Sequence, residues 1–418
     1  MSEIYGLIGE KLGHSFSPQI HRELGGYGYE LFELRPEEVG GFLRKGDFRG
    51  INVTIPYKQT VMPFLDEISE KARRIGSVNT IVRDSDGRLH GYNTDYSGFQ
   101  ALLRRGKLAP EGQKCLVLGS GGASRTAVTC LKDMGAREVR VISRSGEDNY
   151  GNLERQRDAG LIVNATPVGM YPGNGKAPLR LRDLPGIRGA ADMIYNPART
   201  ALMLEAESLG IPRINGLYML VDQARKACEL FTGRTIGEEE TERVTGLLAA
   251  ETANIVLIGM PGCGKSTVGR LLQEQTGRKL IDTDSLIENQ TGMKCGEIIR
   301  EQGEPAFRAM ETEAIREAGK QSGAIIATGG GAVTREENRD LLRQNGLLFH
   351  LYRDMDKRTL EPGRPLSDSR EKWERLERER RPLYAAWRDA LIVNTNPEKA
   401  AAEILRVMRK TAPGLAGL

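Results

Sequence analysis

The chain has 418 residues, of which 39% are hydrophobic, 28% charged and 6% aromatic. This length predicts two to four domains of about 100–200 residues, and the composition excludes a disordered or fibrous protein. The 60 Lys and Arg residues nearly balance the 56 Asp and Glu residues, which gives a net charge of +4. This small excess of positive charge argues against a nucleic-acid-binding protein but suits anionic small substrates.

Neither a membrane span nor an export signal is expected. No run approaches the ~20 consecutive apolar residues that a span needs, and the N-terminus lacks a basic region followed by an apolar stretch. The five cysteines include no CxxC pair, which favours reduced packing residues over disulfides or a zinc cluster. We expect a cytoplasmic protein without nucleic-acid or membrane partners, and the sequence leaves its oligomeric state open.

Short apolar strands alternate with helical patterns along the chain. This alternation predicts an α/β fold, with parallel sheets that helices cover on both faces. The expected strands span residues 5–8, 50–53, 115–118, 139–142, 161–163, 255–258, 280–282, 325–327 and 347–351.

Polar clusters interrupt the N-terminal part, where a core would be apolar. Each has a purely structural alternative, since Ser17 before Pro18 is a good helix N-cap and Asp95 can likewise cap the helix that follows it. Lys58 can be a solvated residue in a first helical turn. The clusters span residues 14–18, 50–58, 78–80 and 93–95.

A glycine-rich loop at residues 119–124 follows the strand 115–118 and opens a helix. The loop matches GxGxxG loosely, because Ser124 replaces the third glycine, but its strand–loop–helix setting predicts dinucleotide binding. After the next strand, Arg144 stands where an NAD-specific protein usually has an acidic residue. Its guanidinium suits the 2′-phosphate of NADP.

Together and in order, these features resemble shikimate dehydrogenase over residues 4–233. The resemblance also rests on residues 164–170, 194–197 and 216–224. It implies an α/β substrate domain, a Rossmann-like NADP domain, and NADPH-dependent reduction of 3-dehydroshikimate to shikimate. A quinate/shikimate dehydrogenase is the alternative.

The resemblance also implies roles for single residues. Lys58 and Asp95 would be the catalytic pair, in which Lys58 protonates the alkoxide as hydride reaches the ketone carbon. The substrate would be contacted by Ser15, Ser17, Asn79 and Gln223, and the same pocket would be lined by Asn52, Thr54 and Tyr195. NADP(H) would be contacted by Gly119, Gly121, Gly122, Ala123, Ser143 and Arg144.

The chain departs from this family after residues 143–145. The family usually carries a second basic residue and a full helix there, whereas residues 146–151 lead quickly to the next strand. We therefore expect a shortened NADP domain. Glu147 and Asp148, beside the expected 2′-phosphate site, leave strict NADP preference open.

Residues 234–254 are acidic, follow a helix that stops at Gly233 and precede a new strand. We interpret residues 234–253 as an interdomain linker with at most a helical turn; an ordinary surface helix is the alternative. The expected domains are residues 1–97, completed by a helix at 217–233, residues 98–216 for NADP, and residues 254–418.

The strongest motif, GxxxxGK[ST] at residues 259–267, lies between the strand 255–258 and a helix. In such a P-loop, backbone N–H groups surround phosphate oxygens, the lysine reaches the β- and γ-phosphates, and the first hydroxyl ligates Mg²⁺. The predicted nucleotide contacts are Gly259, Gly262, Gly264, Lys265, Ser266 and Thr267.

Further polar residues follow at predicted strand and helix ends. Asp282 and Asp284 project on one face, so that one can serve Mg²⁺ while the other orients an acceptor hydroxyl. Arg308 and Glu311 lie three apart on a helix, either as a pair that aims a guanidinium at a carboxylate or as a plain surface pair. Three glycines at 329–331 favour close backbone approach to a ligand.

Residues 254–411 resemble shikimate kinase, which implies a P-loop kinase domain with a parallel sheet and the cofactors ATP and Mg²⁺. An adenylate-kinase-like enzyme is an alternative, and so is a non-catalytic binding module in either half. The resemblance implies that shikimate is bound by Asp284, Arg308, Gly330 and Arg380, and that Glu311 supports Arg308. It also implies that Mg²⁺ is held by Ser266 and Asp282 and that Arg358 lies against adenine. The residues that it implies for catalysis are Lys265, Asp284 and Arg364. The product of the first activity would be the substrate of the second.

Overall fold

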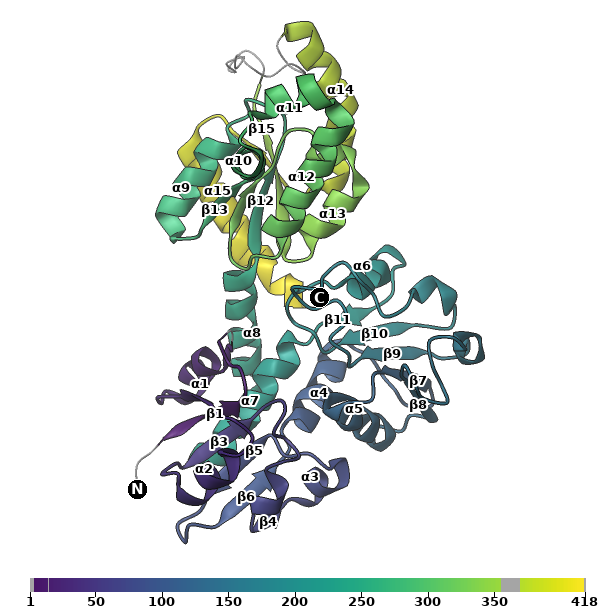
Figure 1. The fold of residues 1–418 in the computed structure, drawn as a ribbon, viewed down its shortest axis with the longest axis vertical. Coiled ribbons are helices and arrows are strands. Elements are labelled where there is room, and N and C mark those ends of the chain that lie inside the picture. The colour runs from purple at the N-terminus through teal and green to yellow at the C-terminus, as the bar shows by residue number, and fades with distance from the viewer. Residues whose placement is uncertain (1–3, 14, 355–368, 417–418) are drawn as a thin grey trace.

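The computed structural model describes residues 4–13, 15–354 and 369–416. These residues form three separate sheets flanked by helices, and Figure 1 shows the first two sheets below the third. The predicted α/β fold is therefore confirmed. Within the described ranges, no helix combines the length and the apolar character needed to cross a membrane.

The first unit contains a six-stranded mixed sheet. Its elements are β1 (Tyr5–Gly9), α1 (Ser17–Gly25), β2 (Glu30–Glu33), α2 (Val39–Lys45), β3 (Gly50–Val53), β4 (Glu67–Ile68), α3 (Glu70–Ile75), β5 (Thr80–Arg83) and β6 (Leu89–Tyr92). The strand order is β2-β1-β3-β5-β6-β4. The expectation of a purely parallel sheet is wrong here, because β5 and β6 form a hairpin and β5 also pairs antiparallel with β3.

The second unit is a parallel five-stranded sheet in the order β11-β10-β9-β7-β8. Its elements are α4 (Asp95–Arg105), β7 (Lys114–Leu118), α5 (Gly122–Asp133), β8 (Glu138–Ile142), β9 (Leu161–Asn164), β10 (Gly189–Asp192), α6 (Ala201–Ser208) and β11 (Arg213–Ile214). The glycine-rich loop joins β7 to α5. Residues 143–160, all described, contain a short 3₁₀ helix at Leu153–Gln156 and no α-helix. A full helix is therefore absent between β8 and β9, in agreement with the sequence.

The third unit is also a parallel five-stranded sheet, in the order β13-β14-β12-β15-β16. Its elements are β12 (Asn254–Ile258), α9 (Lys265–Thr276), β13 (Leu280–Asp282), α10 (Thr283–Thr291), α11 (Cys295–Gln302), α12 (Glu304–Gly319), β14 (Ile325–Ala327), α13 (Glu336–Arg343), β15 (Gly346–Tyr352), α14 (Arg370–Trp387), β16 (Ala390–Val393) and α15 (Pro397–Thr411). The P-loop joins the central strand β12 to α9, at the edge where parallel strands end and ligands usually bind.

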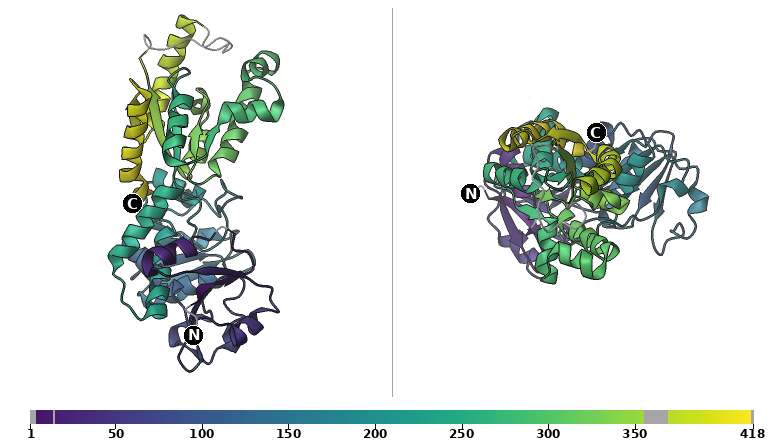
Figure 2. Two further views of the ribbon diagram at one scale, coloured as in Figure 1. Left: turned by 90° about the vertical axis from the view of Figure 1, so that its left-hand side faces the viewer. Right: turned by 90° about the horizontal axis from the view of Figure 1, so that it is seen from above.

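Helices α7 (Leu217–Thr232) and α8 (Glu238–Thr252) connect the units (Figure 2). Helix α8 packs against α7 and α1 and leads directly into β12. The expectation of at most a helical turn in this segment is wrong. Val244 and Leu248, four residues apart, form an apolar stripe that is buried with Ile20 and Leu217, while the acidic residues cluster in the first turn, where they favour a helix.

Candidate active sites

A cavity of 530 Å³ lies at the carboxyl ends of β1 and β3, between the first and second units. Residues that lie far apart in the sequence line it. They include every catalytic and substrate-contacting residue expected for the N-terminal half, namely Ser15, Ser17, Asn52, Thr54, Lys58, Asn79, Asp95, Tyr195 and Gln223. Ala123 of the glycine-rich loop lines the same cavity, so the expected substrate and dinucleotide sites adjoin.

Lys58 and Asp95 form an ion pair in this cavity. The Lys58 Nζ lies 2.6 Å from Asp95 Oδ2, and the two side chains are 26% and 15% exposed. Asp95 is the first residue of α4, where the helix dipole stabilises a negative charge. The arrangement holds a charged ammonium group in the cavity, in reach of a bound ligand.

Buried amides fix the floor of the cavity. Asn79, which is 2% exposed, accepts a hydrogen bond from Thr94 N at 2.7 Å and donates to Thr94 Oγ1 at 3.0 Å. Asn52 donates to Thr80 Oγ1 at 3.0 Å. Gln223 of α7 reaches Asn79 Nδ2 at 3.5 Å, which joins α7 to the first unit at the site.

Ser15 and Ser17 flank the start of α1. Phe16 is the N-cap residue and makes no side-chain cap hydrogen bond, while Ser15 Oγ accepts a hydrogen bond from Ser17 N at 3.2 Å. The alternative of Ser17 as a helix N-cap is therefore wrong. Both serines line the cavity instead.

The glycine-rich loop fits a dinucleotide. Gly119 has a φ of +98°, which favours glycine, and a Cβ at Gly121 or Gly122 would meet no atom within 4 Å. The start of α5 is therefore open at these two glycines, which leaves room for a phosphate group to approach the helix N-terminus.

Arg144 is exposed after the end of β8, and no hydrogen bond or ion pair joins it to the described part of the chain. The neighbouring Asp148 accepts a hydrogen bond from Gln156 at 2.8 Å and lies 3.4 Å from Arg140. Of the two acidic residues near the expected 2′-phosphate site, Asp148 is thus already paired. Ser143 lies at the end of the same strand.

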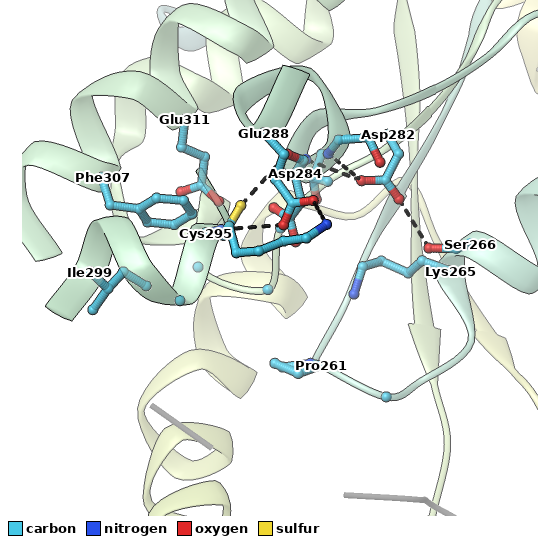
Figure 3. Close-up of a pocket in the computed structure, with 18 of the residues that line it drawn as sticks. Pro261, Lys265, Ser266, Asp282, Asp284, Glu288, Cys295, Ile299, Phe307 and Glu311 are labelled. Carbon is cyan, nitrogen blue, oxygen red and sulfur yellow. Dashed lines mark hydrogen bonds and ion pairs between the residues drawn. The ribbon is translucent and has the colours of Figure 1, made fainter. Parts of the chain in front are cut away.

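A second cavity, of 590 Å³, lies at the carboxyl edge of the third sheet (Figure 3). Its walls come from the P-loop, from α10 to α12, from the glycine run after β14 and from α14. The expected residues that line it are Gly262, Gly264, Lys265, Ser266, Thr267, Asp282, Asp284, Arg308, Glu311, Gly330 and Arg380.

The P-loop has the backbone of a phosphate cradle. Gly259, Gly262 and Gly264 have φ values of +149°, +74° and +97°, which residues with a Cβ rarely adopt. Lys265 crosses the loop, and its Nζ donates to Gly259 O at 2.8 Å. The loop and its lysine therefore fit the phosphates of a nucleotide.

Ser266 and Asp282 bring two oxygen ligands together beside the P-loop. Ser266 Oγ donates to Asp282 Oδ2 at 3.0 Å, while Asp282 Oδ1 accepts from Asp284 N and caps α10 (Figure 3). The described residues contain no cluster of three or more potential His, Cys, Asp or Glu ligands. A hydroxyl and a single carboxylate fit Mg²⁺, which usually keeps several waters and binds substrate phosphates.

Arg308 and Glu311 form a buried ion pair, so the surface-pair alternative is wrong. Arg308 Nη1 lies 2.7 Å from Glu311 Oε2, Glu311 is fully buried and Arg308 is 8% exposed. Burial raises the pKa of Glu311, and Arg308 opposes this rise. Arg380 is also buried, which lowers its pKa, and it donates to Gly330 O at 3.0 Å. Two guanidinium groups thus line one side of the cavity.

The glycine run at 329–331 provides space for these side chains. A Cβ at Gly331 would lie 2.2 Å from the Arg308 guanidinium, and one at Gly329 would lie 2.3 Å from Glu311 Oε1. The sequence predicted that the backbone of these glycines lies close to a ligand. In the structure their backbone lies close to neighbouring side chains and also lines the cavity. None of the three has a positive φ.

Arg358 and Arg364, expected at adenine and at the transferred phosphoryl group, lie outside the described residues. The structure adds wall residues that no motif signalled, because they come from elements between the motifs. They are Lys11 and Met193 in the first cavity, and Glu288, Lys294 and Cys295 in the second.

Two family models match the chain. The model described as shikimate dehydrogenase substrate binding domain matches residues 7–81, and the model described as shikimate kinase matches residues 261–409. The first match contains only part of the lining of the first cavity, whereas the second contains the whole lining of the second cavity. The order of the two matches is that expected from the sequence.

Characterised relatives cover the N-terminal part. The shikimate dehydrogenase (NADP(+)) of Clostridium perfringens is 38% identical in an alignment of 264 residues, and the alignment covers 97% of that protein and 58% of this chain. The Thermus thermophilus shikimate 5-dehydrogenase, solved with NADP(H) and shikimate, is 33% identical with a TM-score of 0.53 and covers 58% of this chain and 98% of its own. A quinate dehydrogenase from Corynebacterium glutamicum, solved with NAD, is 28% identical with a TM-score of 0.52, over 58% of this chain and 98% of its own. The chain therefore belongs to the shikimate dehydrogenase family through its N-terminal part and carries a shikimate kinase domain at its C-terminus.

Proposed function

We propose that the first cavity reduces 3-dehydroshikimate to shikimate with NADPH and that the second phosphorylates the 3-hydroxyl of shikimate with MgATP. The observation that carries the proposal is that the expected catalytic and substrate-contacting residues of each half, as far as the structure describes them, line a single cavity. The chain is then a bifunctional enzyme of the shikimate pathway, whose first product is its second substrate.

In the first site, a bound nicotinamide would supply hydride to the ketone carbon of the substrate. Lys58, which Asp95 positions at 2.6 Å, donates a proton to the carbonyl oxygen as it becomes a hydroxyl. The hydroxyls of Ser15 and Ser17 bind the substrate carboxylate, and Asn79 and Gln223 bind its ring hydroxyls. Arg144 pairs with the 2′-phosphate of NADP.

In the second site, the chain orients two ligands and neutralises charge. Arg308 and Arg380 bind the carboxylate of shikimate, and Asp284 accepts the proton of the attacking 3-hydroxyl. Lys265 stabilises charge on the β- and γ-phosphates. Ser266 and Asp282 would hold Mg²⁺, which would balance negative charge on the transferred phosphoryl group.

We also propose the division of the chain into these activities. Residues 1–97 with the helix 217–233 form the substrate domain, residues 98–216 bind NADP, and residues 254–418 form the kinase. Residues 234–253 connect them, and the packing of α8 on α1 and α7 supports a rigid connection.

Quinate is the substrate that most closely competes with shikimate for the first site, and NAD is the competing cofactor. Initial rates of oxidation of both acids with NADP⁺ and with NAD⁺ test the proposal, with Lys58→Ala as the control for background. We expect the highest kcat/KM with shikimate and NADP⁺. A preference for quinate would overturn the proposed substrate, and no Lys58-dependent oxidation of either acid would leave the N-terminal half as a binding module.

A further inference from the structure

Residues 193–199, which follow β10, lie against two units at once. Met193 and Tyr195 line the dehydrogenase cavity. Asn196, Ala198 and Arg199 contact the third unit, the shikimate kinase domain. One short segment therefore connects the wall of the dehydrogenase site to the kinase domain.

Asn345 of the kinase domain holds the middle of this segment. Its Nδ2 donates to Asn196 Oδ1 at 3.1 Å, and its Oδ1 accepts a hydrogen bond from Ala198 N at 2.7 Å. Asn345 lies between α13 and β15 and is 3% exposed. Because its amide is shielded from water, both bonds face little competition from solvent. The first clamped residue follows Tyr195 directly.

Arg199 fixes the end of the segment on the kinase domain. Its Nε donates to Arg343 O and its Nη2 to Gly346 O, both at 2.7 Å, so it caps the last turn of α13. Burial lowers the pKa of Arg199 to about 10. A buried cation with carbonyl partners at a helix C-terminus indicates a specific docked interface rather than a loose tether.

Tyr195 transmits this clamp to the substrate end of the cavity. Its ring centroid lies 5.9 Å from that of Phe16, at an interplanar angle of 60°. Phe16 stands between Ser15 and Ser17, which line the cavity. A shift of Tyr195 therefore changes the packing beside both serines.

The dehydrogenase half also holds the segment, since Gly216 N donates to Ile194 O at 3.0 Å and Tyr171 N donates to Asn196 O at 3.4 Å. The buried Asp192 accepts hydrogen bonds from Ile194 N at 3.0 Å and from Thr200 Oγ1 at 2.7 Å. Between these anchors, Asn215 Nδ2 donates to Ala198 O at 2.8 Å, and it also donates to Leu415 O of the kinase domain. The side chain of Asn196 is bonded only from the kinase side among the described residues.

We propose that the kinase domain is a positioning element of the dehydrogenase site, and that Asn345 acts by holding Tyr195 against the substrate cavity. The inference rests on the proposed dehydrogenase function. Asn345 lines neither cavity, so it is a positioning residue that acts across the domain boundary. By linkage, a substrate that orders Tyr195 also favours the docked kinase domain.

The variant Asn345→Ala tests this proposal in the full chain. We expect the KM for shikimate in NADP⁺-dependent oxidation to rise by about five- to tenfold, the effect of losing about one net hydrogen bond or slightly more, with a smaller change in kcat. Kinase activity should change little, because Asn345 lies at the amino end of β15 and the P-loop follows the carboxyl end of the neighbouring β12.

Arg343→Ala is the matched control. It removes the Arg343–Glu207 ion pair of 2.6 Å at the same interface without removing a bond to residues 193–199, since Arg199 uses only the main-chain oxygen of Arg343. We expect its KM for shikimate to stay near that of the unaltered chain. Equal KM increases in both variants would contradict the role of Asn345, as would an unchanged KM in a folded Asn345→Ala protein.

Thermal unfolding of each variant shows whether it is folded. If the Asn345→Ala protein does not fold, the KM for shikimate is measured instead for Asn345→Ser, at a temperature where its unfolding curve shows a folded protein. The same increase in KM is expected. If the unaltered chain oxidises no shikimate, the proposed function is wrong and the inference falls with it. A KM unaffected by Asn345 in an active chain overturns the inference alone.

Discussion

Lys58 Nζ lies 2.6 Å from Asp95 Oδ2, although Lys58 follows the sheet strand β3 and Asp95 begins helix α4. The pair joins the first unit to the start of the second at the wall of one cavity. Its position between the expected substrate and dinucleotide sites suits a proton donor for hydride transfer.

Lys58→Ala should lower dehydrogenase turnover by about 10²–10⁴-fold, which is the contribution of one positioned acid–base group. Phosphorylation of added shikimate by the same protein should be nearly unchanged, because the kinase cavity contains neither Lys58 nor Asp95. Steady-state rates of both reactions measure this. Equal losses in both reactions would indicate misfolding, and undiminished dehydrogenase turnover would refute the assignment.

Arg380→Ala should raise the KM of the kinase for shikimate by about 10–100-fold, since it removes a charge-assisted hydrogen bond to the carboxylate. The KM for ATP should change little. Arg308→Lys should act in the same direction while keeping a cation beside the buried Glu311, which Arg308→Ala would leave unpaired. Arg316→Ala, on the outer face of α12, is the control. If Arg380→Ala mainly raises the KM for ATP, the assignment of Arg380 to shikimate is wrong.

Arg144→Ala should reduce the preference for NADPH over NADH by about tenfold or more, because only the 2′-phosphate distinguishes these cofactors and the bond to it is charge-assisted. The ratio of kcat/KM for the two cofactors is the quantity to measure. Arg137→Ala, which removes an exposed cation before β8, should leave the ratio unchanged. If the unaltered chain uses both cofactors equally, Arg144 does not select the cofactor.

Leu248→Ala should lower the free energy of unfolding by about 2–5 kcal/mol, because its side chain is fully buried between α8, α7 and α1. The adjacent Leu247 is only partly buried, so Leu247→Ala should cost clearly less. Denaturant unfolding of both variants measures the difference. Equal costs would contradict the packing of α8 as a structural helix and favour the linker interpretation.

The sequence predicted best the features that consecutive residues carry. The P-loop needs glycines at Gly262 and Gly264 and a lysine beside them, so its function can be inferred from a single stretch. The neighbouring strand and helix were predicted for the same reason, since hydrophobic periodicity is local.

Features that depend on distant pairing were not predicted. The antiparallel position of β5 is set by its partners β3 and β6, and the residues of β5 show no pattern that distinguishes this from a parallel strand. The acidic first turn of α8 concealed the buried stripe of Val244 and Leu248. The contacts of Asn345 and Arg199 depend on how two units dock, which no local motif encodes.

A single reaction shows whether one chain carries both activities. The purified protein is supplied with 3-dehydroshikimate, NADPH and MgATP, and NADP⁺ and shikimate 3-phosphate are measured together. We predict that both products accumulate, that Lys58→Ala abolishes both, and that Lys265→Ala allows NADP⁺ and shikimate to form without the phosphate ester. If the unaltered chain forms shikimate but no shikimate 3-phosphate, it lacks the kinase activity. If it forms no NADP⁺, it lacks the dehydrogenase activity. Either result would contradict a bifunctional enzyme.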